Sequence, residues 1–547
     1  MPAAASDEHN AFSLLTEPWL PVRRADGRRD WVRPAAVAAP DIVDFDWGRP
    51  DFDAAAREFM IGLLATACRD RLVPRWRAWS PTVEELDGVF APLAEAFVLD
   101  GPGARFMQDR EPLTGEAVPV SQLLIEAPGA NTVKRNLDHF VRRGGVRVLS
   151  RAAAAMALFT LQNFAPSGGA GHRTSLRGGG PLVTLIRPGD EAVSLWQRLW
   201  LNAIVPEDGE EGVLTRVFPW TAPTRVSDAG QVTTPSDGHP LQAYWGMPRR
   251  IRLEFSVNVE GAACDLTGLV DPVIVTSYVT RPYGTNYVGW IHPLSPHYRA
   301  KGDRLDWLPV HGQPGRIGYR HYVGLIAAGK DALRRPADVV GETKVRLGRR
   351  AGHRARIDAA GYDMDNMKAR DFIESSMPFF LFGDGEDGLE RDALAMIECL
   401  IGAADLARRL LGQQLRTALF GKDPPDDGGA LALARETFWH LTEGEFWVRI
   451  ARFVQDCERA GEDGAAQAEA LVTCRLAWSG ALRKAALDIF DRLVPAAGFE
   501  NLGQGAVSRI VGARKHLSLG LHGYGKDGAG LFKALGIDPP KGKGAAA

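Results

Sequence analysis

The C-terminal third of the chain constrains the fold most, because it contains four long amphipathic segments separated by short breaks rich in glycine, proline or acidic residues. In the first segment Leu394, Ile397, Ile401 and Ala404 recur three and four residues apart. This spacing places apolar side chains along one face of a helix. Because each such face must pack against a neighbour, the succession predicts a four-helix bundle. The four segments cover residues 389–420, 430–458, 465–493 and 504–517.

The chain before these segments has a mixed pattern of helical and strand-like runs. Asp26-Gly27 lies between two short apolar stretches and favours the tight turn of a hairpin. One helix is expected over residues 52–72, and a second is expected to begin with Ser80 as N-cap and Pro81 at its first position. Pro92 should kink this second helix. Strand-like runs follow at residues 182–186, 251–257 and 273–279.

Together these patterns predict an α+β fold with three parts. An irregular mixed N-terminal domain covers residues 1–385, a C-terminal four-helix bundle covers 386–520, and a flexible tail rich in glycine and lysine covers 521–547.

The composition excludes a disordered protein, a collagen and a membrane protein. Of the 547 residues, 45% are apolar and 24% are charged, which is typical of a globular chain. There is no uninterrupted apolar run of about 18 residues, and residues 1–12 do not resemble a secretory signal. The five cysteines are scattered without a Cys-x-x-Cys pair, which argues against a disulfide framework and against structural zinc. We therefore expect a cytoplasmic protein with free thiols.

Charge is nearly balanced over the whole chain but not locally. The net charge is −2 and the isoelectric point is 6.7, so the total does not indicate nucleic-acid binding. Residues 134–151, however, contain six cations against the single acid Asp138. Phe140 lies among these cations, and an aromatic ring between positive charges suits a single strand whose bases stack and whose phosphates pair. A solvated surface loop is the alternative interpretation.

Residues 165–180 form a second unusual segment, with six glycines among sixteen residues. Glycines allow a ligand to approach the backbone, and Arg173 and Arg177 supply positive charge. The segment contains no Walker A pattern, and the helical residues 152–163 before it exclude a dinucleotide-binding fingerprint. From these residues alone, a ligand loop and a flexible surface connection remain equally good interpretations.

Catalytic patterns are scarce. The sequence has no Gly-x-Ser-x-Gly elbow, no His-Glu-x-x-His and no aspartate-rich two-metal pattern. His292 and His297 are five residues apart, but no nearby cysteine or acidic pair completes a metal site. We expect both histidines to lie in a packed, turn-rich segment and the protein not to be an enzyme.

Several motifs taken together resemble one protein family, the large subunit (CasA) of the type I-E CRISPR Cascade complex. Their order and spacing are more specific than any motif alone, and the resemblance covers nearly the whole chain. They are residues 14–22 (LLTEPWLPV), Phe106-Met-Gln108, the glycine segment, Trp290-Ile-His-Pro293, residues 361–370 (GYDMDNMKAR) and the terminal helices.

The resemblance implies a non-catalytic subunit of a ribonucleoprotein complex in antiviral defence. Such a subunit recognises the protospacer-adjacent motif (PAM) in double-stranded DNA, helps to start strand separation and R-loop formation, and recruits a nuclease-helicase. Sequence is then read by guide pairing. The implied partners are crRNA, target DNA, the recruited nuclease-helicase, and the backbone, handle-binding and small subunits of Cascade.

The resemblance also implies which residues read the motif from the minor groove, where a glycine backbone can enter because it lacks side chains. Arg281 occupies the place of a basic finger. A polar wedge is assigned to Asn366, with Met367 and Lys368 as alternatives. The glycine loop comprises Ser167, Gly168, Gly169, Ala170 and Gly171, where Ala170 replaces an expected glycine.

A long basic loop completes the implied interface, contacting the crRNA handle, neighbouring subunits and target DNA. Phe140 is its candidate stacking residue. Some relatives carry a cysteine-rich zinc insertion, but only Cys264 lies in the corresponding region here, so we predict no zinc and no other cofactor. The basic residues of the loop are Lys134, Arg135, Arg142, Arg143 and Arg147.

Two alternatives compete with this hypothesis. A stand-alone enzyme would hold a phosphorylated small molecule at residues 167–180, with Arg173 and Arg177 as clamps. A purely structural scaffold subunit would belong to the same complex, but mutation of Arg281 and Asn366 would not change the affinity of the complex for the motif.

Overall fold

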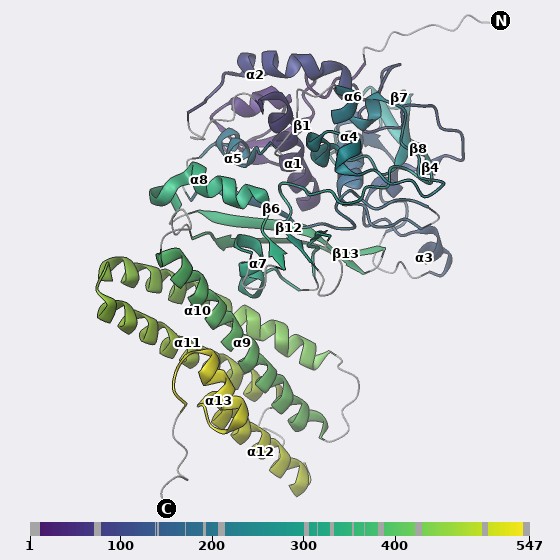
Figure 1. The fold of residues 1–547 in the computed structure, drawn as a ribbon. Helices are drawn as coiled ribbons and strands as arrows, with labels where there is room; N and C mark the ends of the chain where they lie inside the picture. The colour runs from purple at the N-terminus through teal and green to yellow at the C-terminus, as the bar shows by residue number, and fades with distance from the viewer. Residues whose placement is uncertain are drawn as a thin grey trace, which may run out of the picture. The chain divides into compact units, whose positions relative to one another are not determined.

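The computed structural model divides the chain into two compact units (Figure 1). The first unit contains Met1–Arg316 and Gly324–Phe380, and the second contains Ile317–Val323 and Leu381–Ala547. The residues that the structure describes are 11–69, 78–136, 138, 142–169, 171–189, 193–205, 214–299, 306–313, 315–328, 333–352, 355–365, 367–380, 388–421, 429–494 and 502–539.

The first sheet of the first unit confirms the predicted hairpin. Strands β1 (Leu20–Arg24) and β2 (Arg29–Val32) pair antiparallel, and Gly27 in the turn between them has a φ of 84°. This left-handed conformation suits glycine, which has no Cβ. Strand β3 (Ile42–Phe45) pairs with the other edge of β1.

Helix α1 (Pro50–Ala67) lies in the core of the first unit and packs against α4 (Arg151–Phe164). The helix expected over residues 52–72 is therefore present, but it begins at Pro50 and ends earlier than expected, at Ala67 with Cys68 as its C-cap. The ring of Phe59 on α1 is surrounded by other buried aromatic rings. These are Trp19, Phe97, Phe106, Phe159 and Trp245, with ring centroids 5.2–6.0 Å from that of Phe59.

Helix α2 (Val83–Phe90) begins two residues later than expected. Thr82, not Ser80, is the N-cap, because Glu85 completes a capping box with it. The Thr82 hydroxyl accepts from the backbone N–H of Glu85, and the Glu85 carboxylate accepts from the backbone N–H of Thr82. At the predicted kink the chain continues as a 3-10 helix, η3 (Ala91–Phe97), with Pro92 in its first turn.

The strand-like runs of the sequence form two further sheets. In one, β8 (Val273–Arg281) pairs antiparallel with β7 (Arg250–Val257), β4 (Val118–Pro119) and β5 (Leu149–Ser150). The run predicted at residues 251–257 is thus β7, and that at 273–279 is β8.

The other sheet has the order β13-β12-β6. Strands β12 (Arg356–Asp365) and β13 (Lys368–Pro378) form a long hairpin, and β6 (Val183–Arg187) pairs with the far edge of β12. Helix α8 (Asp338–Gly352) packs on β6. Met367, which belongs to the region assigned as the wedge, lies in the turn between the two strands of this hairpin.

The remaining elements of the first unit are short. They are η1 (Pro34–Ala38), η4 (Val120–Leu123), α3 (Ala130–Lys134), α5 (Leu195–Asn202), α6 (Leu214–Val217), η5 (Pro219–Thr221), η6 (Pro235–Asp237), η7 (Pro240–Trp245), β9 (His297–Tyr298), β10 (Leu308–Pro309) and β11 (Arg334–Arg335).

The second unit is helical and contains the four predicted segments. They are α9 (Gly388–Phe420), α10 (Ala430–Ala460), α11 (Gly464–Leu493) and α12 (Gln504–Leu521). Helix α9 packs against the other three, so its apolar stripe is covered as its periodicity predicts. The buried indole N–H of Trp478 on α11 donates to the carbonyl of Leu400 on α9 at 2.9 Å.

The segment for which we expected a flexible tail contains a further helix, α13 (Gly525–Ala534), packed on α9 and α12. Leu531 and Leu535 are both buried and lie four residues apart, which gives this glycine-rich segment one apolar face. Residues 540–547 lie outside the described part of the chain.

Residues 317–323 belong to the helical unit although they lie within the sequence of the first. They contain η8 (Tyr319–His321) and the start of α7 (Tyr322–Ile326). The ring of Tyr319 stacks on Phe446 with centroids 4.4 Å apart, and its hydroxyl is 2.8 Å from that of Thr442. No helix among the described residues is both long and apolar enough to cross a membrane.

Candidate nucleic-acid interface

The glycine loop follows directly after α4. The backbone N–H of Gly168 donates to the carbonyl of His172, and the N–H of His172 donates to the carbonyl of Gly169, which closes a tight turn. Gly169 and Gly171 have φ values of 67° and 83°, a region that residues with a Cβ adopt rarely. Ser167 and Gly168 are exposed, whereas Ala170 lies outside the described residues.

Arg249 supports this loop. Its guanidinium donates to the carbonyl of Pro166, and a Cβ added to Gly168 would lie 2.5 Å from its Nη1 atom. Burial lowers the pKa of Arg249 to about 10, and burial and the nearby Arg249 lower the pKa of His172. An added Cβ would also lie 2.7 Å from Cβ of His172, so a side chain at position 168 would require both the Arg249 guanidinium and the loop itself to shift.

Arg281 is the last residue of β8 and is exposed. Its guanidinium donates to the Thr114 hydroxyl at 3.0 Å and forms no ion pair with any described residue. Arg250, directly opposite on β7, differs: it pairs at 2.6 Å with the buried carboxylate of Asp109. Of these two neighbouring arginines, Arg281 therefore keeps its positive charge available to a ligand.

The structure brings the chain just after Arg281 into contact with the glycine loop. The backbone N–H of Tyr283 donates to the carbonyl of Gly171 at 2.9 Å, and the carbonyl of Tyr283 accepts from the N–H of Ser227. Arg173 reinforces the same place, since its guanidinium donates to both the hydroxyl and the carbonyl of Ser227 at 2.9 Å. Arg173 thus joins the glycine segment to the loop that contains Ser227.

Arg177 is not available as a phosphate clamp, which corrects the clamp hypothesis. Its guanidinium pairs with the carboxylate of Glu58 on α1, and both side chains are buried. Burial lowers the pKa of Arg177 and raises that of Glu58. Of the two arginines expected to hold a phosphorylated ligand, one is enclosed in the core and the other bonds to Ser227.

Two of the wedge candidates, Met367 and Lys368, lie at the tip of the β12–β13 hairpin. Met367 and Lys368 are both exposed, and Asn366 lies outside the described residues. The far end of the glycine segment meets this hairpin, because a Cβ added to Gly180 would lie 2.6 Å from Cγ of Met364. One segment, residues 165–180, therefore contacts both the Arg281 region and the wedge hairpin.

The basic loop contains one internally neutralised arginine. Arg143 pairs with the carboxylate of Asp138 and also donates to the carbonyl of Val133. The other four cations are exposed and form no ion pair among the described residues, whereas Phe140 lies outside them. These four are Lys134, Arg135, Arg142 and Arg147.

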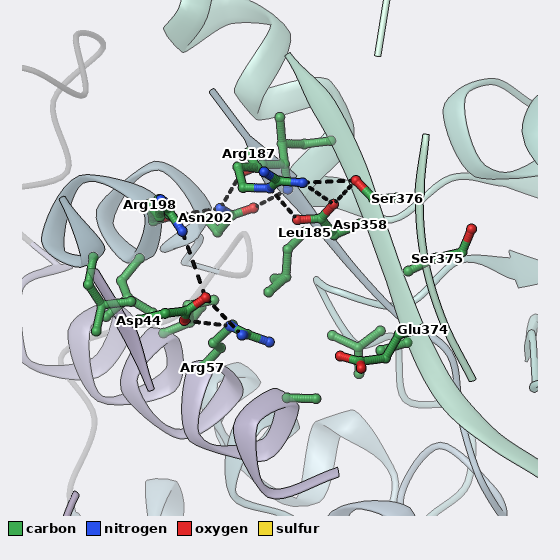
Figure 2. A pocket seen from close by; sticks show the side chains of 18 of the residues that line it. Asp44, Arg57, Leu185, Arg187, Arg198, Asn202, Asp358, Glu374, Ser375 and Ser376 are labelled. Carbon is green, nitrogen blue, oxygen red and sulfur yellow. Dashed lines mark hydrogen bonds and ion pairs between the residues drawn. The ribbon is translucent and has the colours of Figure 1, made fainter. Parts of the chain in front are cut away.

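A separate pocket of about 420 Å³ lies between α1, α5 and the β13-β12-β6 sheet (Figure 2). Arg57 and Arg198 both face the carboxylate of Asp44, at 3.0 and 3.7 Å, and Arg187 pairs with Asp358 at 2.9 Å. No histidine, cysteine, lysine or tyrosine is among its lining residues. One lining serine hydroxyl donates to the carboxylate of Asp358, but Arg187 already neutralises that group, which makes it a weak base for activating a nucleophile.

The two histidines of the Trp290 segment are buried, as expected. Burial lowers the pKa of His292 well below its usual value and lowers that of His297 to about 4. No cluster of three or more His, Cys, Asp or Glu side chains placed to hold a metal occurs within the described ranges.

Sequence reasoning missed Arg249 and Tyr283. Arg249 is one of many arginines in the sequence, and its role in supporting the glycine loop becomes visible only in the structure, from its hydrogen bond to the carbonyl of Pro166. Tyr283 carried one signal, because it stands between Pro282 and Gly284, four residues beyond the strand predicted at 273–279, in a sequence typical of a turn.

The fold and this interface define a class of protein: an irregular α+β unit that presents an exposed glycine loop beside an unpaired arginine, joined to a C-terminal helical unit. A family model described as CRISPR-associated protein Cse1 matches residues 13–489. The chain therefore belongs to the Cse1 family, also called CasA.

Solved structures share the fold. A CasA structure from Thermus thermophilus matches with a TM-score of 0.65 and 20% identity, covering 93% of this chain and 99% of that one. A Cse1 structure from Acidimicrobium ferrooxidans matches with a TM-score of 0.65 and 19% identity, covering 98% and 100%. A chain of a structure described as a CRISPR RNA-guided surveillance complex matches with a TM-score of 0.65 and 19% identity, covering 93% and 99%.

Proposed function

We propose that this chain is the non-catalytic large subunit of a cytoplasmic crRNA-guided Cascade complex and that it recognises the protospacer-adjacent motif in duplex DNA. The observation that supports this most is the exposed guanidinium of Arg281, which forms no ion pair within the described part of the chain and lies close to a glycine loop that the protein itself holds in place. A backbone without side chains can enter a minor groove about 6 Å wide, and a neighbouring guanidinium can donate to base-edge acceptors there.

The wedge hairpin supports a second step, the start of strand separation. Met367 and Lys368 are exposed at a β-hairpin tip, so they can enter a duplex without unfolding any element. Asn366 remains the first candidate for this contact. The glycine segment meets the same hairpin at Gly180, which links motif recognition to the wedge in one connected part of the chain.

The basic loop supports the proposed contacts with crRNA and DNA backbone. Lys134, Arg135, Arg142 and Arg147 offer four charges to phosphates. The other proposed partners are the backbone, handle-binding and small subunits of Cascade and the recruited nuclease-helicase. The phosphate-binding enzyme is the weaker alternative, because Arg177 is enclosed with Glu58.

The test is motif-dependent DNA binding by the reconstituted complex containing this chain. Arg281→Ala should weaken binding of a motif-bearing duplex by about 1–3 kcal/mol and reduce the preference over a duplex without the motif. Arg281→Lys should retain part of that preference. The matched control is Arg28→Ala, which removes an exposed arginine from the β1–β2 turn.

Equal binding of motif and non-motif duplexes by the unmodified complex would refute motif recognition. Motif preference that survives both Arg281→Ala and Asn366→Ala would favour the scaffold alternative instead.

A further inference from the structure

Tyr283 has a backbone conformation that a tyrosine rarely adopts. Its φ is 59°, in the left-handed region, where the Cβ of an L-residue approaches the following carbonyl. Such conformations persist where the surrounding structure imposes them, and they cluster at functional sites. A glycine would adopt this φ without strain, so the tyrosine side chain itself needs an explanation.

One side of the Tyr283 ring packs against the glycine loop of the protein itself. A Cβ added to Gly171 would lie 2.7 Å from Cε1 and 3.0 Å from Cδ1 of the tyrosine, so the ring lies directly against this glycine. Together with the hydrogen bond from the Tyr283 N–H to the Gly171 carbonyl, this contact fixes one end of the glycine loop. It also explains why position 171 excludes a side chain.

The rest of the ring is exposed to solvent. Tyr283 is 41% exposed, so its ring is open to a ligand on this side. It lines a polar recess of about 300 Å³ together with Arg281 and Thr114. This volume is at the lower end of the range of small-ligand sites, about 300–1,000 Å³. An aromatic wall beside a guanidinium that forms no ion pair among the described residues suits a nucleotide unit, with the ring against its apolar part and the cation near its base edge.

We propose that Tyr283 is a DNA-contact residue, whose exposed ring packs against the sugar and base edge of a nucleotide beside the glycine loop. This inference rests on the proposed function and adds to it an aromatic contact that does not depend on base identity. The nearby acid Asp228 also lines the recess and repels phosphate, so the nucleotide enters with its phosphate directed away from Asp228.

The experiment compares Tyr283→Gly and Tyr283→Phe in the reconstituted complex. Tyr283→Gly removes the ring and relieves the backbone strain, so we expect the unfolding temperature of the full chain to stay close to that of the unmodified protein. Affinity for a motif-bearing duplex should fall about tenfold, because the ring contact is lost. Tyr283→Phe keeps the ring and should bind within about twofold of the unmodified complex.

Tyr298 supplies the matched control, since it is a tyrosine of the same unit with the same exposed fraction, 41%. Tyr298→Ala should leave duplex affinity unchanged. A second readout reports contact directly: a photo-crosslinking p-benzoylphenylalanine at position 283 should attach to nucleotides beside the motif, and the same group at position 298 should not.

The outcomes separate this inference from the proposed function. If Tyr283→Gly binds normally while Arg281→Ala loses motif preference, the tyrosine contact is refuted and motif recognition stands. If Tyr283→Gly weakens binding but position 283 does not crosslink, the ring only positions the loop and the contact is refuted. If the unmodified complex shows no motif preference, motif recognition itself fails.

Discussion

Arg177 and Glu58 form a buried ion pair that joins the glycine segment to helix α1. The Nη2–Oε1 distance is 2.5 Å, and the side chains are 2% and 0% exposed. The second guanidinium nitrogen of Arg177 donates to the Ser295 hydroxyl at 3.1 Å. A segment that contains six glycines is thus anchored in the core by one charged side chain.

Removing one partner of this pair should destabilise the chain. Arg177→Ala leaves the Glu58 carboxylate buried and uncompensated, so we expect the free energy of unfolding to fall by about 3–5 kcal/mol. Urea denaturation of the full chain measures this. The double variant Arg177→Met with Glu58→Leu removes both charges and should recover much of the loss. An Arg177→Ala protein of normal stability would show that the pair contributes little.

Two glycines of the loop should respond differently to alanine. At Gly171 a Cβ meets the Tyr283 ring at 2.7 Å and φ is 83°, so Gly171→Ala should lower both stability and duplex affinity. At Gly169 φ is 67° but no atom lies within 4 Å of an added Cβ, so Gly169→Ala should cost only about 1 kcal/mol of backbone strain. Thermal unfolding compares the two variants, and equal losses would contradict the Tyr283 contact.

The basic loop contains its own control pair for nucleic-acid binding. Arg142 forms no ion pair among the described residues, whereas Arg143 is paired with Asp138. Arg142→Ala should weaken binding at low salt and reduce the slope of log K against log salt by about 1. Arg143→Ala should change that slope less. Salt titrations of the complex bound to a labelled duplex measure both slopes. Identical slopes for the two variants would contradict the prediction that pairing with Asp138 keeps Arg143 from binding phosphate.

The buried histidine His297 should make stability depend on pH. Its pKa is lowered to about 4 by burial and by the nearby cations Arg335 and Arg177. Between pH 6.5 and 4 the unfolded chain binds more protons at this residue than the folded chain, so its contribution to stability falls as pH falls through that window.

His297→Leu should therefore flatten the dependence of the unfolding temperature on pH between 6.5 and 4, leaving the parts due to other groups whose pKa burial shifts, among them His292, His311 and His172. An unchanged curve in His297→Leu would show that this histidine does not titrate with unfolding.

The helical unit was the part best predicted from the sequence, because helix periodicity is a local property. The spacing of Leu394, Ile397 and Ile401 is sufficient to define α9 without knowledge of its neighbours. The N-cap of α2 shows the limit of local reasoning: Ser80 was expected as the cap, but the reciprocal hydrogen bonds of Thr82 with Glu85 place it at Thr82.

The candidate site was harder to predict, because its contacts join residues far apart in the sequence. The glycine segment was recognised from its composition, but its role and that of Arg281 were assigned only through the family resemblance. The pairing of Arg177 with Glu58, 119 residues away, leaves no signal in either local sequence. The strain at Tyr283 likewise depends on its hydrogen bond to the Gly171 carbonyl, which only the fold creates.

Residues 317–323 have a consequence for how this chain can be divided in evolution or in the laboratory. The helical unit includes this short stretch, and Tyr319 is enclosed there by Trp439, Phe446 and Trp478. A single recombination point near residue 380 would separate the tyrosine from its three aromatic partners. The two halves therefore have to be inherited together, and a swapped C-terminal half must bring side chains that fit a tyrosine encoded before the crossover.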